Sequence, residues 1–347
     1  MQQPEHQEQS AVVPKKRSKL RGALRASLFL LAAVVIAAGW FVFYALMPGP
    51  RVEVSHSRVF ISKGASVEEI GDLLESAGLL DSDPRFLLLT RILGVASRLP
   101  AGEFILDTNQ NPVDLLNQLV DAKPVQHQLT VVEGLTMEEI AELFAAAGWI
   151  DKDRFLALAG DPATITAFGL DGIASLEGYL FPDTYQLIKP SPGEGKILAR
   201  LVNRALEVYG SLDFGNADLS RHQVFTLASI VEKETGMADE RPVIASVFHN
   251  RLRKRMKLQS DPTVIYGIDG FNGPLTKKDL KTPTPYNTYS INGLPPGPIC
   301  SPGRDSLQAV LTPADTNYLY FVSKNDGSHY FSASLGEHNR AVRKYQR

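Results

Sequence analysis

One pattern occurs twice in the chain, as KGASVEEIGDLLESAGLLDSDPRFL (residues 63–87) and as EGLTMEEIAELFAAAGWIDKDRFL (residues 133–156). Over residues 64–83 the two copies are offset by 70 positions, and nine of those 20 positions are identical. In each copy a hydroxyl residue stands where it can cap a helix and a glycine where it can end one (Ser66 and Gly78; Thr136 and Gly148). Residues with strand character precede both copies, so the sequence predicts a duplicated β-turn-α unit.

The first copy is expected to lie in a small module of residues 51–122. Residues 51–61 alternate like a strand, residues 103–106 have strand character, and residues 113–120 read as a helix. The second copy, at residues 127–160, opens a larger domain of residues 123–347. The module either binds a ligand or only spaces this domain from what precedes it.

Residues 26–47 contain no charged side chain, and 22 residues of helix are long enough to cross a hydrocarbon core about 30 Å thick. Six basic residues precede this run, and Trp40 and Tyr44 lie near its far end. This asymmetry predicts a transmembrane helix with residues 1–25 as a cytoplasmic tail and the rest of the chain outside. The alternative is a cleaved signal peptide, but the run exceeds the usual 7–15 residues and no small-x-small site follows before Pro48.

The composition excludes several other classes of protein. The 347 residues include 36 basic and 38 acidic side chains, a net charge of −2, so neither wholesale disorder nor a surface that coats nucleic acid is expected. Cys300 is the only cysteine, which rules out an intrachain disulfide and a cysteine-rich metal site. The motifs HExxH, GxSxG and GxGxxG are absent. No cofactor and no metal are predicted.

Residues 222–345 read as a second core. Helices are expected at residues 222–233 and 239–255, and a third begins at Ser260-Asp261-Pro262, with Asp261 as its N-cap. Residues 282–303 hold six prolines and three glycines, which predicts a long loop without regular structure. A hairpin turning at residues 325–327 and a helix at residues 336–345 end the chain. The fold class is therefore α+β: a transmembrane helix, a duplicated β-α module and a mixed α/β catalytic domain.

The helix with LASIVEKET (residues 227–235) carries the strongest catalytic candidate. At about 100° per residue Glu234 falls in line with Leu227 and Val231, and a carboxyl held against apolar side chains has a raised pKa that suits a proton donor. A Glu-Lys-Glu run is also typical of a solvated helix edge. Cys300 with His329 or His338 is an alternative nucleophile and base, although a small residue in a proline-rich loop explains Cys300 more simply.

Several motifs in the same order resemble the endolytic murein transglycosylases, the membrane-anchored lytic enzymes of bacterial cell-wall synthesis. These motifs are EGYLFPDTY (177–185), LASIVEKET (227–235), ERPVIASVFHNRL (240–252), LQSDPTVIYG (258–267), TPYNTYSINGLPPGPI (284–299), SPG (301–303), YLYFV (318–322) and HYF (329–331). The likeness covers the chain from about Arg51 to its end, and Cys300 is its visible departure. It implies a LysM-like module at residues 51–122 and an inner-membrane protein facing the periplasm. Its implied partners are peptidoglycan glycan strands and peptidoglycan synthases of the elongation or division machinery.

The resemblance also implies a mechanism and a site. Glu234 corresponds to the single essential glutamate, which protonates the leaving oxygen and then deprotonates the C6 hydroxyl of N-acetylmuramic acid as that hydroxyl attacks its own C1. The product is a 1,6-anhydro-MurNAc end, and cleavage within nascent strands would terminate glycan elongation. Candidate substrate-binding residues are those that can stack on sugars or hold acetamido groups, namely Ser229, Gln259, Asp261, Thr263, Tyr286, Asn287 and Tyr289.

Two other functions stay open at this point. A lysozyme-like peptidoglycan hydrolase would pair Glu234 with Asp239, Glu240 or Asp261, because hydrolysis needs a second carboxylate. A peptidoglycan-binding scaffold would keep the repeats and lack activity. The label aminodeoxychorismate lyase, sometimes given to related sequences, requires a lysine that binds pyridoxal phosphate, and the sequence singles none out.

Overall fold

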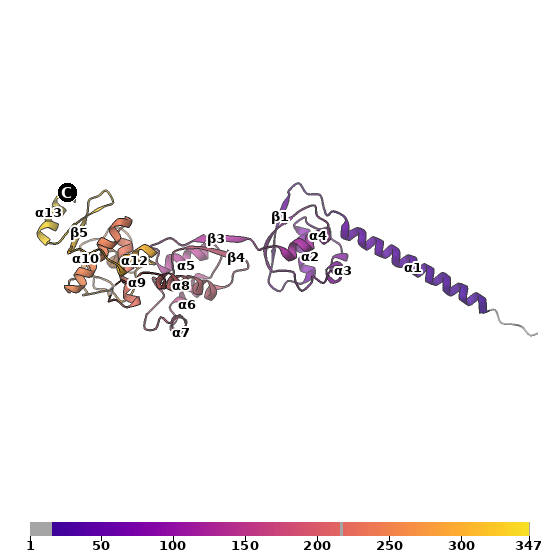
Figure 1. Ribbon diagram of the computed structural model, residues 1–347, viewed down its shortest axis with the longest axis horizontal. Helices are drawn as coiled ribbons and strands as arrows, with labels where there is room; N and C mark the ends of the chain where they lie inside the picture. Colours follow the sequence, from indigo (N-terminus) through magenta and orange to yellow (C-terminus); the bar gives the residue numbers. More distant parts are fainter. Residues whose placement is uncertain (1–15, 216–217, 347) are drawn as a thin grey trace, which may run out of the picture. The chain divides into compact units, whose positions relative to one another are not determined.

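Helices and two-stranded sheets make up the computed structural model, which describes residues 16–215 and 218–346 (Figure 1). The chain divides between Val125 and Gln126 into two compact units. Among the described residues, strands pair only antiparallel, in three separate two-stranded sheets. The α+β class and the long apolar helix near the N-terminus are confirmed. Residues 1–15 of the expected tail lie outside the described residues.

The first unit begins with α1 (Lys16–Leu46), drawn in indigo in Figure 1. Its segment Arg21–Leu46 contains an 18-residue stretch with a mean hydropathy of 2.4 and is long and apolar enough to cross a membrane. The large apolar side chains of this segment are exposed for most of its length. Only near its end does α1 pack on the module, where Tyr44 and Ala45 become buried.

A β-α-α-β-α order builds the module itself. The elements are β1 (His56–Ile61), α2 (Val67–Ser76), α3 (Arg85–Ile92), β2 (Gly102–Asp107) and α4 (Pro112–Asp121). Val59 lies opposite Phe104 in the antiparallel pair, and both side chains point into the module's hydrophobic core. The strand predicted from residue 51 begins only at His56, because its partner β2 ends opposite that residue at Asp107.

The start of each repeat has the local structure that the sequence predicts. The backbone amide of Glu69 donates to the Ser66 hydroxyl at 3.1 Å, and the Ser66 amide donates to the Glu69 carboxylate at 2.6 Å. Thr136 and Glu139 form the same reciprocal cap, so two amides at each helix start gain a partner. Both helices end before a glycine with positive φ, at +70° for Gly78 and +73° for Gly148.

The second unit opens with the second repeat. Its elements are β3 (Gln126–Thr130), α5 (Met137–Ala146), α6 (Lys152–Ala159), α7 (Pro162–Ala167), β4 (Thr184–Ile188), α8 (Glu194–Gly210), α9 (Arg221–Glu234), α10 (Arg241–Arg253), α11 (Asp261–Tyr266), α12 (Arg304–Leu311), β5 (Tyr320–Ser323), β6 (His329–Ser332) and α13 (Leu335–Tyr345). Short 3-10 helices lie at Ala238–Glu240 and Asp279–Lys281. The predicted hairpin and final helix are confirmed as β5, β6 and α13.

Helix α9 lies at the centre of this unit, and every residue from Val224 to Val231 is buried. It packs against α10, α11 and α12. Burial is not confined to the side of the helix that carries Leu227 and Val231, because Thr226 and Ser229, on other sides, are as deeply buried. Their hydroxyls donate to backbone carbonyls of the helix one turn earlier, which lets polar residues occupy the core.

The proline-rich segment 282–303 has no helix or strand, as predicted. It is held from outside by hydrogen bonds: the amide of Ile299 donates to the Ser229 hydroxyl at 3.0 Å, and His222 contacts the carbonyl of Pro296 at 2.8 Å. Gly178, with φ of +82°, lies directly against this segment, because a Cβ built there would be 2.3 Å from the Cβ of Pro298. The loop therefore packs as part of the core.

We expect Gly178→Ala to unfold at distinctly lower denaturant concentration than Gly172→Ala. Both glycines have a similar positive φ, but a Cβ at Gly172 meets open space. Gly172→Ala should cost about 1–2 kcal/mol from backbone strain alone. Gly178→Ala should cost about 1–3 kcal/mol more, because Pro298 must move. Equal unfolding free energies for the two variants would contradict tight packing of the loop.

Candidate active site

Glu234 is the last residue of α9 and lies where that buried helix reaches the surface. Its Oε1 accepts a hydrogen bond from the Ser260 hydroxyl at 2.5 Å, and the residue keeps partial exposure. The pKa of Glu234 is raised to about 7. Burial is the largest cause and the charge of Asp261 adds to it, while the Ser260 hydrogen bond and the charges of His329 and Arg251 oppose them. The carboxyl is therefore poised to gain or lose a proton near neutral pH.

Ser260 is held in place by hydrogen bonds to its backbone. Its amide donates to Thr288 Oγ1 at 2.9 Å, and its carbonyl accepts from Thr263 Oγ1 at 2.6 Å. Ser260 is also the N-cap residue of α11, so the prediction of Asp261 at that position is wrong by one residue. Its side chain makes no capping bond, because the hydroxyl turns to Glu234.

Four of the predicted substrate-binding residues lie at least partly exposed: Gln259, Asp261, Tyr286 and Tyr289. The Tyr289 hydroxyl donates to Asp261 Oδ1 at 2.6 Å, one residue after Ser260. Gln259 has a left-handed backbone with φ of +48°, which is unusual for a residue with a Cβ. Tyr286 packs edge-on against Tyr266 at 4.8 Å between ring centroids.

The other three predicted substrate-binding residues are completely buried and face the interior. They are Ser229, Thr263 and Asn287. The Ser229 hydroxyl accepts a hydrogen bond from the amide of Ile299, and the Thr263 hydroxyl bonds to the carbonyl of Ser260 and the hydroxyl of Thr288. The side-chain amide of Asn287 donates to the carbonyls of Leu280 and Thr282. A loop rich in proline lacks a ladder of backbone hydrogen bonds, so side chains must satisfy its polar groups. These residues build the wall of the site, and their side chains do not reach its surface.

Glu232 has surroundings that differ from those of Glu234. Its carboxylate accepts the amide of Gly303 at 2.9 Å and lies 3.6 Å from the guanidinium of Arg241. Arg241 is also 3.8 Å from Glu133 in the second repeat. Burial and the neighbouring Glu232 both raise the pKa of Glu133. Glu232 thus fixes the end of the proline-rich loop to the start of the second repeat.

Glu177 is a second carboxyl with a raised pKa, which the sequence analysis did not single out. Burial raises its pKa to about 7, although three hydrogen bonds oppose this effect. The donors are the amides of Met137 and Gly178 and the hydroxyl of Tyr266. Glu177 therefore closes the first turn of α5 and ties it to α11. Its only sequence signal is its place at the head of EGYLFPDTY.

The nucleophile and base considered for Cys300 are not assembled. The thiol is fully buried and contacts the carbonyl of Ser229 at 3.4 Å, and burial raises its pKa. His329 is bound to Glu240 at 2.6 Å, and His338 stacks on Tyr320. A thiol kept protonated without a base is not a nucleophile.

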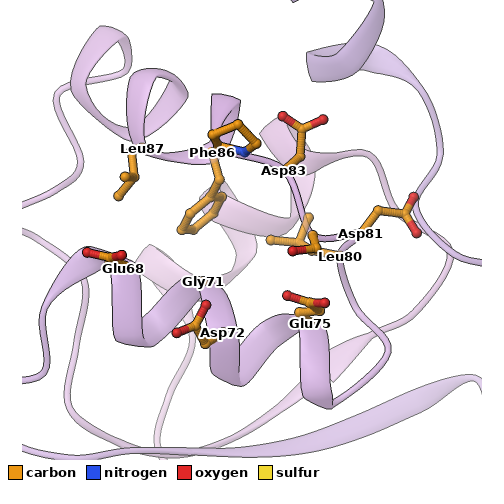
Figure 2. Close-up of a pocket in the computed structure, with 11 residues that line it drawn as sticks. Glu68, Gly71, Asp72, Glu75, Leu80, Asp81, Asp83, Phe86 and Leu87 are labelled. Carbon is orange, nitrogen blue, oxygen red and sulfur yellow. The ribbon is translucent and has the colours of Figure 1, made fainter.

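Two cavities among the described residues are lined by side chains other than Glu234. One of about 830 Å³ is lined by residues of α10 and of the segment after α12, including His249, Arg253 and Thr312. Another of about 260 Å³ lies in the module between α2 and the start of α3, where Phe86 points toward Gly71 among carboxylates (Figure 2). Within residues 16–215 and 218–346, no group of three His, Cys, Asp or Glu side chains is placed to hold a metal ion.

Comparison with known proteins identifies the family. A family model described as the YceG-like family matches residues 59–344. The chain belongs to the YceG-like family.

Proteins named endolytic murein transglycosylase are similar over nearly the whole chain. The one from Bacillus subtilis (strain 168) is 34% identical over 330 residues, 90% of this chain and 91% of that protein. The one from Streptococcus pneumoniae (strain ATCC BAA-255 / R6) is 30% identical, and the match spans 92% of this chain and 64% of that longer protein. A crystal structure of a YceG-like protein from Listeria monocytogenes is 32% identical, with a TM-score of 0.56 over 82% of this chain and 98% of that one.

These relatives confirm the resemblance drawn from the motifs and, with it, the enzyme class, lytic transglycosylase. The YceG-like match covers Glu234, Ser260 and the proline-rich loop. It begins at residue 59, so α1 and its basic flank lie outside it.

Proposed function

We propose that this chain is an endolytic lytic transglycosylase that cleaves the bond between MurNAc and GlcNAc within peptidoglycan strands. Glu234 is the catalytic acid and base, and the product ends in 1,6-anhydro-MurNAc. The observation that carries the proposal is a partly exposed carboxyl whose pKa is raised to about 7 and whose orientation is fixed by Ser260. The names of the relatives supply the substrate class.

One carboxyl is enough for this reaction because the substrate supplies the nucleophile. Protonated Glu234 donates its proton to the glycosidic oxygen as the bond from that oxygen to C1 of MurNAc breaks. The C6 hydroxyl of the same sugar then attacks C1 and gives its proton to the Glu234 carboxylate. Glu234 returns to its starting state and no water is consumed. A hydrolase would need a second carboxylate to activate water or to attack C1.

Ser260 supports both halves of this cycle. Because its hydroxyl donates to Oε1 of Glu234, the proton of the neutral acid sits on Oε2, which is then the oxygen that faces the glycosidic bond. When Oε2 loses its proton, the same hydrogen bond stabilises the carboxylate until the C6 hydroxyl returns a proton. The bonds from Thr288 and Thr263 to the Ser260 backbone keep this geometry fixed.

The exposed members of the predicted groove are proposed to hold the glycan: Gln259, Asp261, Tyr286 and Tyr289. Asp261 and Tyr289 are bound to each other beside the catalytic pair, where a phenol ring can stack on a sugar face. Because these four side chains are at least partly exposed, a polymer that lies across the site can contact them.

A lysozyme-like hydrolase is the alternative, and the structure narrows its possible second carboxylate. Glu240 is bound to His329, whereas Asp261 adjoins Ser260 and acts electrostatically on Glu234. Asp261 already accepts the Tyr289 hydroxyl, which favours a role in binding. Mass analysis of cleaved strands separates the two functions, because hydrolysis gives reducing ends and transglycosylation gives anhydro ends. Binding without either product would indicate the scaffold function.

We also propose that α1 stays on the mature protein as an anchor. Tyr44 and Ala45, 8% and 6% exposed, belong to the hydrophobic core of the module, and Arg85 donates to the carbonyl of Trp40 at 2.8 Å. Cleavage near Pro48 would remove these contacts, which argues against a signal peptide.

In this proposal the enzyme faces the periplasm from the inner membrane, beside peptidoglycan synthases. The β-α-α-β-α module at residues 51–122 acts as a LysM-like unit that holds the strand, and cleavage terminates glycan elongation.

A reporter enzyme that works only outside the cytoplasm should be active when it is fused after Arg347. The basic residues before α1 favour this orientation. Cell fractionation should find the intact chain, with its N-terminal residues, in the membrane. A soluble form that begins near Pro48 would show that α1 is a signal peptide.

Glu234→Gln should abolish formation of anhydro ends, by at least about 10²-fold in rate, because the amide cannot transfer the proton. Glu232→Gln is the matched control from the same helix. It weakens contacts to Gly303 and Arg241, so it should lower the melting temperature. Its turnover per folded molecule should stay close to that of the parent chain. If Glu232→Gln were inactive and Glu234→Gln near normal, with both folded, the acid would have to be assigned to Glu232.

Ser260→Ala should lower kcat and shift the alkaline limb of the rate to higher pH. The acid must be protonated, so activity falls as pH rises through about 7, and loss of a hydrogen bond that lowers this pKa moves the fall upward. Ser260→Thr keeps a hydroxyl and should restore most of the rate and the original limb. A drop in kcat without any shift, unrescued by threonine, would point to a purely structural effect.

A further inference from the structure

The module contacts α1 at Trp40, before the apolar segment of α1 ends at Leu46. The guanidinium of Arg85, the first residue of α3, lies 3.9 Å from the ring centroid of Trp40 and 4.5 Å from that of Tyr44. The same side chain donates to the Trp40 carbonyl and pairs with Asp83. The start of α3 is thereby fixed to α1 at the level of Trp40.

This position conflicts with a membrane that stops where α1 ends. Arg25 is the last charged residue before the apolar run, and Trp40 lies fifteen positions further along the chain. At about 1.5 Å per residue this is about 22 Å of helix, less than a hydrocarbon core about 30 Å thick. A tilted helix would reach even less far along the membrane normal. With Arg25 at the cytoplasmic surface, Trp40 and the start of α3 reach the outer part of the bilayer and cannot lie beyond its opposite interface.

The face of α3 that meets α1 is apolar beyond Arg85. Leu88 and Ile92 follow Arg85 at spacings of three and seven residues, which places all three on one side of the helix. Leu88 is 50% and Ile92 62% exposed, whereas Phe86 and Leu89, on the adjoining side, are buried in the module. The exposed apolar side chains of α1 are therefore followed, beyond the Arg85 contact, by exposed apolar side chains on α3.

We propose that the face of α3 formed by Arg85, Leu88 and Ile92 rests in the outer interface of the bilayer that α1 crosses. The occupant of this face is lipid, because the face adjoins the one helix among the described residues that can span a membrane. Trp40, in contact with Arg85, belongs to a residue type that is enriched at this depth. The inference rests on the proposed anchor and adds a second contact that fixes the module's height and tilt on the membrane.

The test places an environment-sensitive fluorophore on the face, in the full-length chain. Ile92→Cys is labelled with a nitrobenzoxadiazole dye and reconstituted into phosphatidylcholine vesicles, with or without phosphatidylglycerol. Lipids brominated near the headgroup serve as quenchers. Ile105→Cys is the matched control, because Ile105 is a similarly exposed isoleucine (51%) on the sheet, whereas α1 packs on α3 and α4. Cys300 is buried, and any labelling of it is measured on the parent chain, which has no added cysteine.

We expect blue-shifted emission and strong quenching at position 92, in both kinds of vesicle, and neither effect at position 105. Equal response in neutral vesicles is expected because the contact is apolar. If the chain floats with the vesicles but both labels stay in water, the inference about α3 is wrong and the anchor stands. Quenching at both positions would also overturn it, because the contact would not belong to one face. A chain that does not float with vesicles would overturn the anchor itself.

Discussion

The hydrogen bond from Ser260 to Glu234 is the contact on which the proposed chemistry depends, and the rest of the second unit holds its two ends in place. Glu234 is positioned by α9, a helix buried from Val224 to Val231. Ser260 is positioned by threonine hydroxyls that bond to its backbone. Glu234 lies at the edge of the buried core, where burial raises its pKa while partial exposure leaves it accessible to a substrate.

The proline-rich loop supplies rigidity by a route that differs from secondary structure. Prolines restrict its backbone, and buried side chains such as Ser229 and Asn287 satisfy its polar groups. Some polar residues that were candidates for binding sugar therefore form hydrogen bonds with the loop instead. The loop can still present Tyr286 and Tyr289 at its surface, because the backbone beneath them is fixed.

Local rules predicted those features that depend on neighbouring residues. The caps at Ser66 and Thr136, the glycine ends and the irregular loop follow from short-range chemistry, and helix periodicity predicted the raised pKa of Glu234. The misses depend on contacts between distant residues. Ser260 and Asp261 are both good capping residues, and the choice between them involves Glu234, 26 positions away. The depth of Thr263 and of Glu177 is likewise set by packing, which no local pattern reports.

The two copies of the repeat have come to bear different constraints. In the second copy, the amide of Gly134 donates to the carbonyl of Ser301 and the amide of Ser301 donates to the carbonyl of Leu135, so this turn is stitched to the end of the loop that forms the site. In the first copy the matching residues are Gly64, which is exposed, and Ala65, which is partly exposed, and both line an open hollow of about 570 Å³. Insertions and sequence drift can therefore accumulate in the first turn at little cost to folding, whereas any length change in the second would displace the loop from α9. The turn of the first copy is thus free to vary, whereas that of the second is part of the framework that holds the loop.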